Sequence, residues 1–176
     1  MFTHLVMTII GDDRPGLVDQ LAKVIVDNEG NWLESQLAHL ANKFTGIVTV
    51  QVPEEKANTL QAAAKSIEGL SVHVEVAADA TMATPPPGTP LVLDVIGQDR
   101  LGIVRKIAHC LAECGVNVEK LHSACESAPM SGEQLFRAHI QARVPEGANE
   151  DAIHREIEEI ASDLMVDIRF SDTEKE

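Results

Sequence analysis

The sequence has no tyrosine, and its 176 residues include only one tryptophan and four phenylalanines. Proteins that bind single strands of nucleic acid stack bases on aromatic side chains, so a base-stacking surface is not expected. Basic residues are also scarce: 14 lysines and arginines stand against 28 aspartates and glutamates, and the net charge is −14. Neither half of the chain is net basic. Because a protein that neutralises phosphates needs a basic surface, direct binding to nucleic acid is disfavoured.

Long apolar runs and paired cysteines are missing as well. The apolar runs span only a few residues, far short of the roughly 20 needed to cross a bilayer, so no membrane span is expected. The N-terminus has no basic region followed by an apolar stretch, and no secretory signal is predicted. Three cysteines, Cys110, Cys114 and Cys125, do not make a disulfide framework. These features predict a cytoplasmic protein.

The sequence does contain an internal repeat. Residues 10–18 read IGDDRPGLV, and residues 96–104 read IGQDRLGIV, at an offset of 86. Further on, residues 52–54 match residues 144–146 at an offset of 92. The second copy therefore gains six residues, which we expect in the turn-rich segment 126–132.

Three consecutive prolines lie between the two copies. Such a run is incompatible with a helix interior or a central strand, and it predicts a semi-extended linker. We predict a first domain over residues 1–77, a proline-rich linker over residues 78–89 and a second domain over residues 90–176.

Each copy has the same order of predicted elements. A strand rich in β-branched residues, at 5–10 and at 91–96, precedes an amphipathic helix, two strands, a second helix and a closing strand. This βαββαβ order is the ferredoxin-like arrangement, in which helices cover one face of an antiparallel sheet. Residues 135–144 alternate between apolar and polar side chains, which places a polar set on the open face. The predicted fold class is α+β, with two tandem ferredoxin-like domains.

The strongest candidate site is the turn between the first strand and first helix of each copy. Asp13 and Asp99 are placed to cap the helix, and Pro15 suits its first turn. Gly16 and Gly102 leave the backbone open to a ligand, and the N–H groups at a helix N-terminus attract a carboxylate. The neighbouring acids repel a phosphate but tolerate an ammonium group, so an amino acid is favoured. The alternative is a well-capped turn that binds nothing.

Asparagines and histidines give weaker signals. Asn31 and Asn117 each open the second strand, where an amide suits both ends of an amino acid but is also common in a turn. His122 and His139 are expected on one open sheet face, as a polar patch or as solvated side chains. Cys110 continues the apolar helix pattern and is interpreted, like Cys114, as a buried small hydrophobe rather than a metal ligand.

These motifs resemble tandem ACT domains, which are βαββαβ modules that bind amino acids and regulate partners. The resemblance rests on the GDDRPGLV turn at residues 11–18, the following helix and Asn31, all repeated after the linker. In the second copy, Ala128-Pro-Met-Ser-Gly132, then residues 135–138 (LFRA) and 163–168 (DLMVDI), are similar to the glycine cleavage system transcriptional repressor family. Members of that family are described as binding a LysR-type transcription activator in response to glycine, without reading DNA themselves.

The resemblance also implies where a ligand binds. In ACT domains the first loop of one module and the asparagine of a neighbouring module contribute, and the implied residues are Asp13, Arg14, Pro15, Gly16, Asn31, Asp99, Arg100, Leu101, Gly102 and Asn117. Leu101 departs from the proline of the first copy, so the two copies are expected to differ in affinity, or only one binds.

The expected function is therefore a regulatory amino-acid-binding protein, without catalytic residues, metal or cofactor. Two alternatives stay open. One is an interaction adaptor without a ligand, and the other is an acylphosphatase-like enzyme that uses Arg14 or Arg100 in its first loop. Because sheet edges are usually paired or protected, a homo-oligomer is expected.

Overall fold

The computed structural model describes residues 1–77, 87–127 and 133–171. The chain divides into two compact units, Met1–Thr84 (unit 1) and Pro85–Glu176 (unit 2). Unit 1 contains β1 (Phe2–Asp12), α1 (Leu17–Asp27), β2 (Asn31–Leu40), β3 (Lys43–Pro53), α2 (Glu54–Lys65) and β4 (Leu70–Ala77). Unit 2 contains β5 (Thr89–Gln98), α3 (Ile103–Glu113), β6 (Asn117–Ser127), β7 (Gln134–Val144), α4 (Glu150–Leu164) and β8 (Val166–Ser171).

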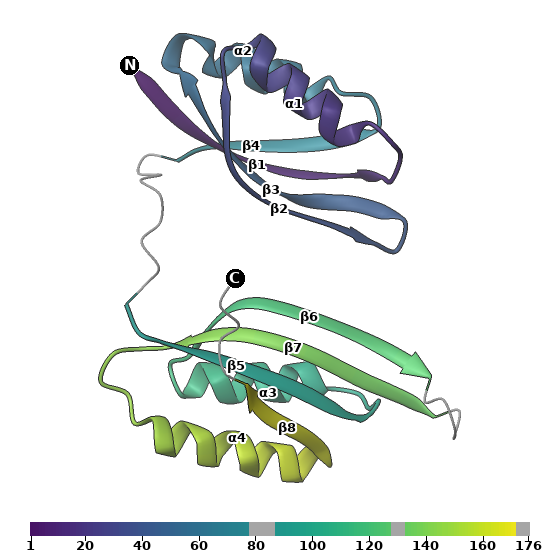
Figure 1. The fold of residues 1–176 in the computed structure, drawn as a ribbon, viewed down its shortest axis with the longest axis vertical. Helices are drawn as coiled ribbons and strands as arrows, with labels where there is room; N and C mark the ends of the chain where they lie inside the picture. Colours follow the sequence, from purple (N-terminus) through teal and green to yellow (C-terminus); the bar gives the residue numbers. More distant parts are fainter. Residues whose placement is uncertain (78–86, 128–132, 172–176) are drawn as a thin grey trace. The chain divides into compact units, whose positions relative to one another are not determined.

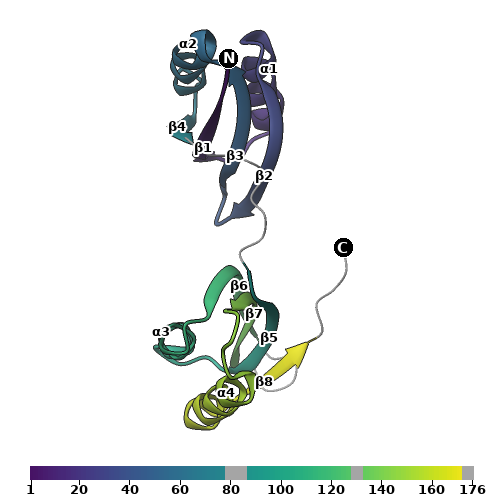
Figure 2. The same cartoon turned by 90° about the vertical axis from the view of Figure 1, so that its left-hand side faces the viewer.

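Each unit has one antiparallel sheet with two helices on one face (Figure 1). The strand order is β2-β3-β1-β4 in unit 1 and β6-β7-β5-β8 in unit 2. Figure 2 shows both helices of each unit on the same side of their sheet, so the other face, called the open face below, is covered by neither described helix of that unit. The predicted α+β class and the tandem ferredoxin-like arrangement are confirmed.

The core of each unit follows from the strand alternation. In β1, Leu5, Met7 and Ile9 are fully buried beneath the helices, because successive side chains of a strand point to opposite faces. The predicted alternation in β7 is also confirmed, with every second residue from Phe136 to Val144 buried. Two separate apolar clusters result, one in each unit.

The buried stripes of the first helices are narrow. Leu17, Leu21 and Ile25 of α1 are buried, but Val18 is 45% exposed, and its counterpart Val104 in α3 is 41% exposed. Each of these valines directly follows the first buried residue of its helix, and one residue turns the helix by about 100°. Both valines therefore lie at the border of the buried stripe.

The strands are longer than predicted. β5 begins at Thr89, inside the segment predicted as linker, and Pro90 lies within the strand opposite Arg143. A proline is tolerated there because pairing with β8 begins only at Val92, so one side of β5 is unpaired at Pro90. The rest of the predicted linker, apart from residues 87 and 88, and most of the predicted insertion lie outside the described residues. None of the described helices is long and apolar enough to cross a membrane.

Candidate functional site

The predicted turn joins β1 to α1 and β5 to α3 through a left-handed glycine. Gly16 has φ +91° and Gly102 has φ +90°, and each is the residue directly before its helix. Left-handed backbone disfavours side chains, which explains glycine at both positions. A Cβ placed on either glycine would meet no atom within 4 Å. The backbone at each helix N-terminus is therefore open, as predicted.

The predicted caps are wrong. Neither α1 nor α3 has a hydrogen bond from a capping side chain. Asp13 instead uses its backbone N–H to bond the carbonyl of Asn42 at 3.0 Å, and Asp99 bonds the carbonyl of Gln134 at 2.9 Å. These bonds hold each aspartate at the hairpin of the neighbouring strands, so neither carboxylate caps the helix. Pro15 likewise lies in the turn before α1 and not in its first helical turn.

Arg14 and Arg100 both reach the turn between the second helix and the last strand of their unit. Nη2 of Arg14 donates to the carbonyl of Glu68 at 2.8 Å and to Oε1 of Gln20 at 3.1 Å. Arg100 lies 3.8 Å from Sδ of Met165 and donates to Gln98 at 3.3 Å. Both guanidinium groups thus tie the first loop to its own unit.

Side chains of the β2–β3 hairpin also contact the unit 1 loop, and they were not among the predicted site residues. Lys43 forms an ion pair with Asp12, and its hydrogen bond and charge hold the pKa of that carboxyl below the usual range. Nε2 of His39 lies 3.6 Å from the carboxylate of Asp13. The hairpin turns through Ala41 and Asn42, both with positive φ, as in the tight turn that favours asparagine and glycine. Asn42 tolerates positive φ, so it is the residue from which this turn could have been inferred.

A hollow of about 570 Å³ lies beside the unit 1 loop. This volume is in the range of small-molecule pockets. Charged and apolar side chains share its lining, which consists of Asp13, Arg14, Gly16, Leu17, Val18, Asp19, Ala22 and Phe44. The hollow could accept a carboxylate near Gly16 and an ammonium group near the aspartates, which is the chemistry of an amino acid.

Asn31 and Asn117 open β2 and β6 as predicted, but they lie at the other end of each sheet. Asn31 pairs with Gln51, which pairs with His4, whereas the loop leaves β1 after Asp12. At about 3.4 Å per residue, His4 and Gly11 are roughly 24 Å apart along the strand. The loop and the asparagine of one unit therefore do not meet, and a site that uses both needs a second unit.

The open sheet face of unit 2 carries the polar patch expected around the two histidines. His122 and His139 are register partners on adjacent strands. Nδ1 of His139 lies 2.8 Å from Asp94, whose other oxygen accepts a hydrogen bond from Ser171. These hydrogen bonds, the His139 contact first, hold the pKa of Asp94 below its usual range. A hollow of about 260 Å³ lies here, between Asp94, the histidines and the Arg137–Glu126 ion pair.

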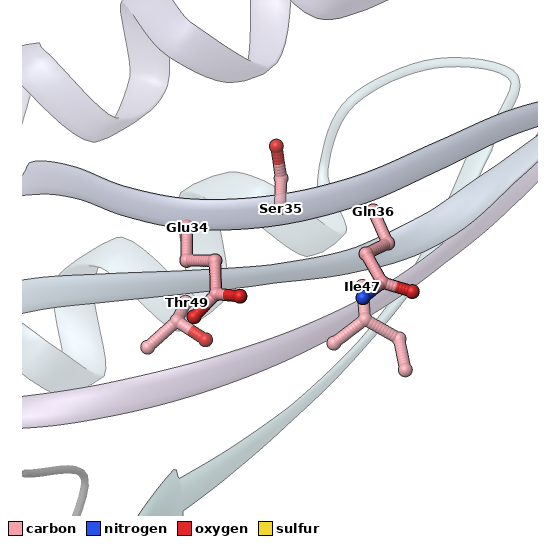
Figure 3. A pocket seen from close by; sticks show the side chains of 5 residues that line it. All are labelled: Glu34, Ser35, Gln36, Ile47 and Thr49. Carbon is pink, nitrogen blue, oxygen red and sulfur yellow. The ribbon is translucent and has the colours of Figure 1, made fainter. Parts of the chain in front are cut away.

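A smaller hollow on the open sheet face of unit 1 was not predicted (Figure 3). Its volume is about 220 Å³. Glu34 and Thr49 are register partners, as are Gln36 and Ile47, and all four point to the same side in Figure 3 while Ser35 points away. The alternation in β2 could not reveal this face from sequence, because a bulge between Trp32 and Glu34 shifts the register.

The cysteines of α3 contribute to packing. Cys110 is buried, and burial, followed by the neighbouring Cys114, raises its pKa to about 11. Cys114 packs against the same core, as predicted. Within the described ranges, no three His, Cys, Asp or Glu side chains are grouped to hold a metal ion.

The model of the ACT domain family matches residues 3–77 and 89–171, which is nearly the whole chain in two copies. The chain belongs to the ACT domain family. Each unit is therefore one ACT domain, with the first loop at the position that the repeat indicated.

Three further proteins match this chain over both ACT domains. The glycine cleavage system transcriptional repressor of Escherichia coli (strain K12) is 26% identical over 155 residues, which are 87% of this chain and 80% of that protein. A crystal structure of an unknown protein from Galdieria sulphuraria has a TM-score of 0.86 at 24% identity, covering 97% of this chain and 98% of the other. A structure provisionally assigned as a glycine cleavage system transcriptional repressor has a TM-score of 0.68 at 20% identity, with 97% of both chains covered. These two structures show the shared fold.

Proposed function

We propose that this protein is a regulator that binds glycine or a related small amino acid and changes the action of a transcription factor by protein–protein contact. Two ACT domains make up nearly the whole chain, and the relative from Escherichia coli is named as a transcriptional repressor of the glycine cleavage system. The partner that the family resemblance suggests is a LysR-type transcription activator.

The observation that carries the ligand part of this proposal is the open loop of unit 1. A left-handed glycine exposes the backbone at the N-terminus of α1, beside a hollow of about 570 Å³ lined by acidic and apolar side chains. The helix N-terminus attracts the ligand's carboxylate, and Asp13 attracts its ammonium group. We assign Asp13, Arg14, Pro15, Gly16 and Asn31, with Asp99, Arg100, Leu101, Gly102 and Asn117, as the ligand-site residues.

The proposed regulation depends on the distance between the first loop of a unit and the asparagine, Asn31 or Asn117, that opens its second strand. Because the two lie at opposite ends of a sheet, a ligand that touches both must bridge two ACT domains, of one chain or of two chains. Such a ligand favours the arrangement in which the domains meet, and a partner that prefers one arrangement then responds to the ligand. The net charge of −14 supports contact with a protein partner over contact with DNA.

We propose no catalytic role for the arginines of the first loops. An acylphosphatase-like reaction would need a free guanidinium in the first loop to hold a phosphate. Arg14 is engaged by the carbonyl of Glu68 and by Gln20, and Asp12 and Asp13 add negative charge beside it. The contacts therefore support binding rather than phosphate chemistry.

Thermal unfolding in the presence of each of the twenty amino acids at millimolar concentration tests the ligand part. A ligand at ~100 times its dissociation constant adds about 2.7 kcal/mol of stability, which shifts the melting temperature by several degrees. We expect a selective shift with glycine or a similarly small amino acid. Asn31→Ala should reduce the shift without changing the melting temperature of the free protein by more than about 2 °C, since its side chain is exposed. A melt that no amino acid shifts would favour the ligand-free adaptor.

A further inference from the structure

The loop of unit 1 and the end of β1 are contacted from three sides. Lys43 of β3 pairs with Asp12, the last residue of β1, and His39 of β2 lies 3.6 Å from the carboxylate of Asp13. Arg14 reaches the α2–β4 turn, where it donates to the carbonyl of Glu68 at 2.8 Å. Each contact involves a side chain that carries charge or gains it on protonation, and each comes from a different segment of the unit.

In the part of unit 2 that the structure describes, other side chains stand at these positions. Gln98 stands at the position of Asp12, and its strand partner is Leu135. Cys125 stands at the position of His39, and its thiol faces Asp99. The pKa of Cys125 is raised, first by desolvation and then by the negative charge of Asp99. Arg100 contacts the sulfur of Met165 at 3.8 Å, where Arg14 has a backbone carbonyl. A thioether is a weak acceptor, so this contact stabilises less than a short charge-assisted hydrogen bond.

The residue between the arginine and the glycine adds to this difference. Pro15 fixes its own φ and has fewer conformations to lose when the loop becomes ordered. Leu101 has no such restraint, and its side chain is completely exposed, at 103% of the reference value. Among the described residues, the unit 1 loop and the end of β1 thus have a proline and three contacts from charged or histidine side chains, whereas the unit 2 loop has the contacts of Arg100 with Gln98 and Met165 and the contact of Cys125 with Asp99.

We propose that unit 1 is the ligand-binding half of the protein, and that Arg14, His39 and Lys43 are positioning residues that hold its loop in the binding conformation. This inference rests on the proposed function above. A loop that is ordered before the ligand arrives loses less conformational entropy on binding, so the same backbone geometry binds more tightly in unit 1 than in unit 2. The hollow lined by Gly16, Leu17 and Phe44 gives the ordered loop an adjacent volume for a small ligand.

The first test compares the two loops without any ligand, by ¹⁵N relaxation of the full chain. The amides of Arg14 and Gly16 should show order parameters near about 0.85, and those of Arg100 and Gly102 values below about 0.6. Arg14→Gln should lower the values at Arg14 and Gly16, whereas the matched Arg100→Gln should leave Gly102 close to its starting value. Equal order parameters in the two loops would overturn the claim that the unit 1 loop is held more firmly.

The second test measures the dissociation constant of glycine by calorimetry. Trp32, the single tryptophan, lies beside Asn31 at the other end of the unit 1 sheet and would not report directly on the loop. Arg14→Gln should weaken binding severalfold, because the unit 1 loop then has to become ordered when the ligand binds, and Arg100→Gln should weaken binding less than Arg14→Gln does. Arg14→Lys, which keeps a donor for the Glu68 carbonyl, should recover part of the loss.

The outcomes separate the two proposals. If Arg100→Gln weakens binding as much as Arg14→Gln, the assignment to unit 1 is wrong although the protein still binds an amino acid. If the wild-type protein binds no amino acid, the proposed function and the ligand-binding role of unit 1 both fail, and the relaxation data still decide how firmly each loop is held.

Discussion

At the scale of single residues, glycine is required at two positions near the repeated turn, and the physical reason differs between them. Gly16 is required by its left-handed backbone, and a side chain there would have space. Gly11 is required by close packing, because a Cβ would lie 2.2 Å from the carbonyl oxygen of Gly69 in the adjacent turn. Gly11 lies inside β1, which continues through Asp12.

This difference predicts that substitution by alanine destabilises the protein to a different extent at each glycine. Gly16→Ala should cost about 1 kcal/mol of unfolding free energy, because only left-handed strain is added. Gly11→Ala should cost more, about 2–3 kcal/mol, because backbone atoms have to move to make room. Urea unfolding of both variants at pH 7 measures the two costs. A larger cost for Gly16→Ala than for Gly11→Ala would contradict the assignment.

Asp94 gives a prediction of pH dependence. His139 and Ser171 lower its pKa in the folded state, so it contributes stability above its unfolded pKa of about 3.9, and this stability is lost as pH falls through the folded pKa. Asp94→Asn should therefore destabilise the protein at pH 6 by at most about 1 kcal/mol, since the pair is half exposed. The difference from wild type should shrink as the pH falls below about 4. A difference that grows on acidification would show that the sign is wrong.

The cysteines predict an order of chemical labelling. Cys110 is buried with its pKa raised to about 11, whereas Cys125 is exposed at the end of β6. Because the thiolate is the reactive form and needs access, iodoacetamide should label Cys125 in the folded protein and Cys110 only after unfolding. Peptide mass spectrometry at pH 8 with and without urea distinguishes the sites. Labelling of Cys110 at the rate of Cys125 in the folded state would contradict its burial.

At the scale of secondary-structure elements, most of the fold could be predicted because the signals are local. The period of two in β7 and the apolar stripes of α1 and α3 indicate their buried faces directly. The contacts of the site could not be predicted in this way. The positions of Lys43 and His39 beside the first loop depend on the register of the β2–β3 hairpin, and the reach of Arg14 depends on the distant turn at Glu68.

The capping error has the same origin. An aspartate shortly before a helix is a good candidate for a cap when only the sequence is known. The backbone N–H of Asp13 donates to the carbonyl of Asn42 in the β2–β3 hairpin, and Gly16 is the residue directly before α1. The competing interaction is between distant segments, so the sequence contained no local sign of it.

At the scale of the whole molecule, the two ACT domains have separate cores, which predicts separate responses to core substitutions. Leu60→Ala in unit 1 should cost about 2–5 kcal/mol and lower the urea midpoint reported by Trp32. The matched Ile157→Ala in unit 2 should leave the Trp32 transition within error and shift only part of the far-ultraviolet circular dichroism transition. A Trp32 transition that moves equally with both variants would show that the units unfold as one.

The central claim at this scale is that the tandem ACT domains bind an amino acid. Calorimetric titration of glycine into the full chain tests it most directly, with Gly16→Val, which fills the open backbone at the first loop, as the control. We expect saturable binding of glycine to the wild-type protein and loss of binding in the variant. Absence of heat with glycine and with every other small amino acid, for a protein that remains folded, would show that the ACT domains are not an amino-acid sensor.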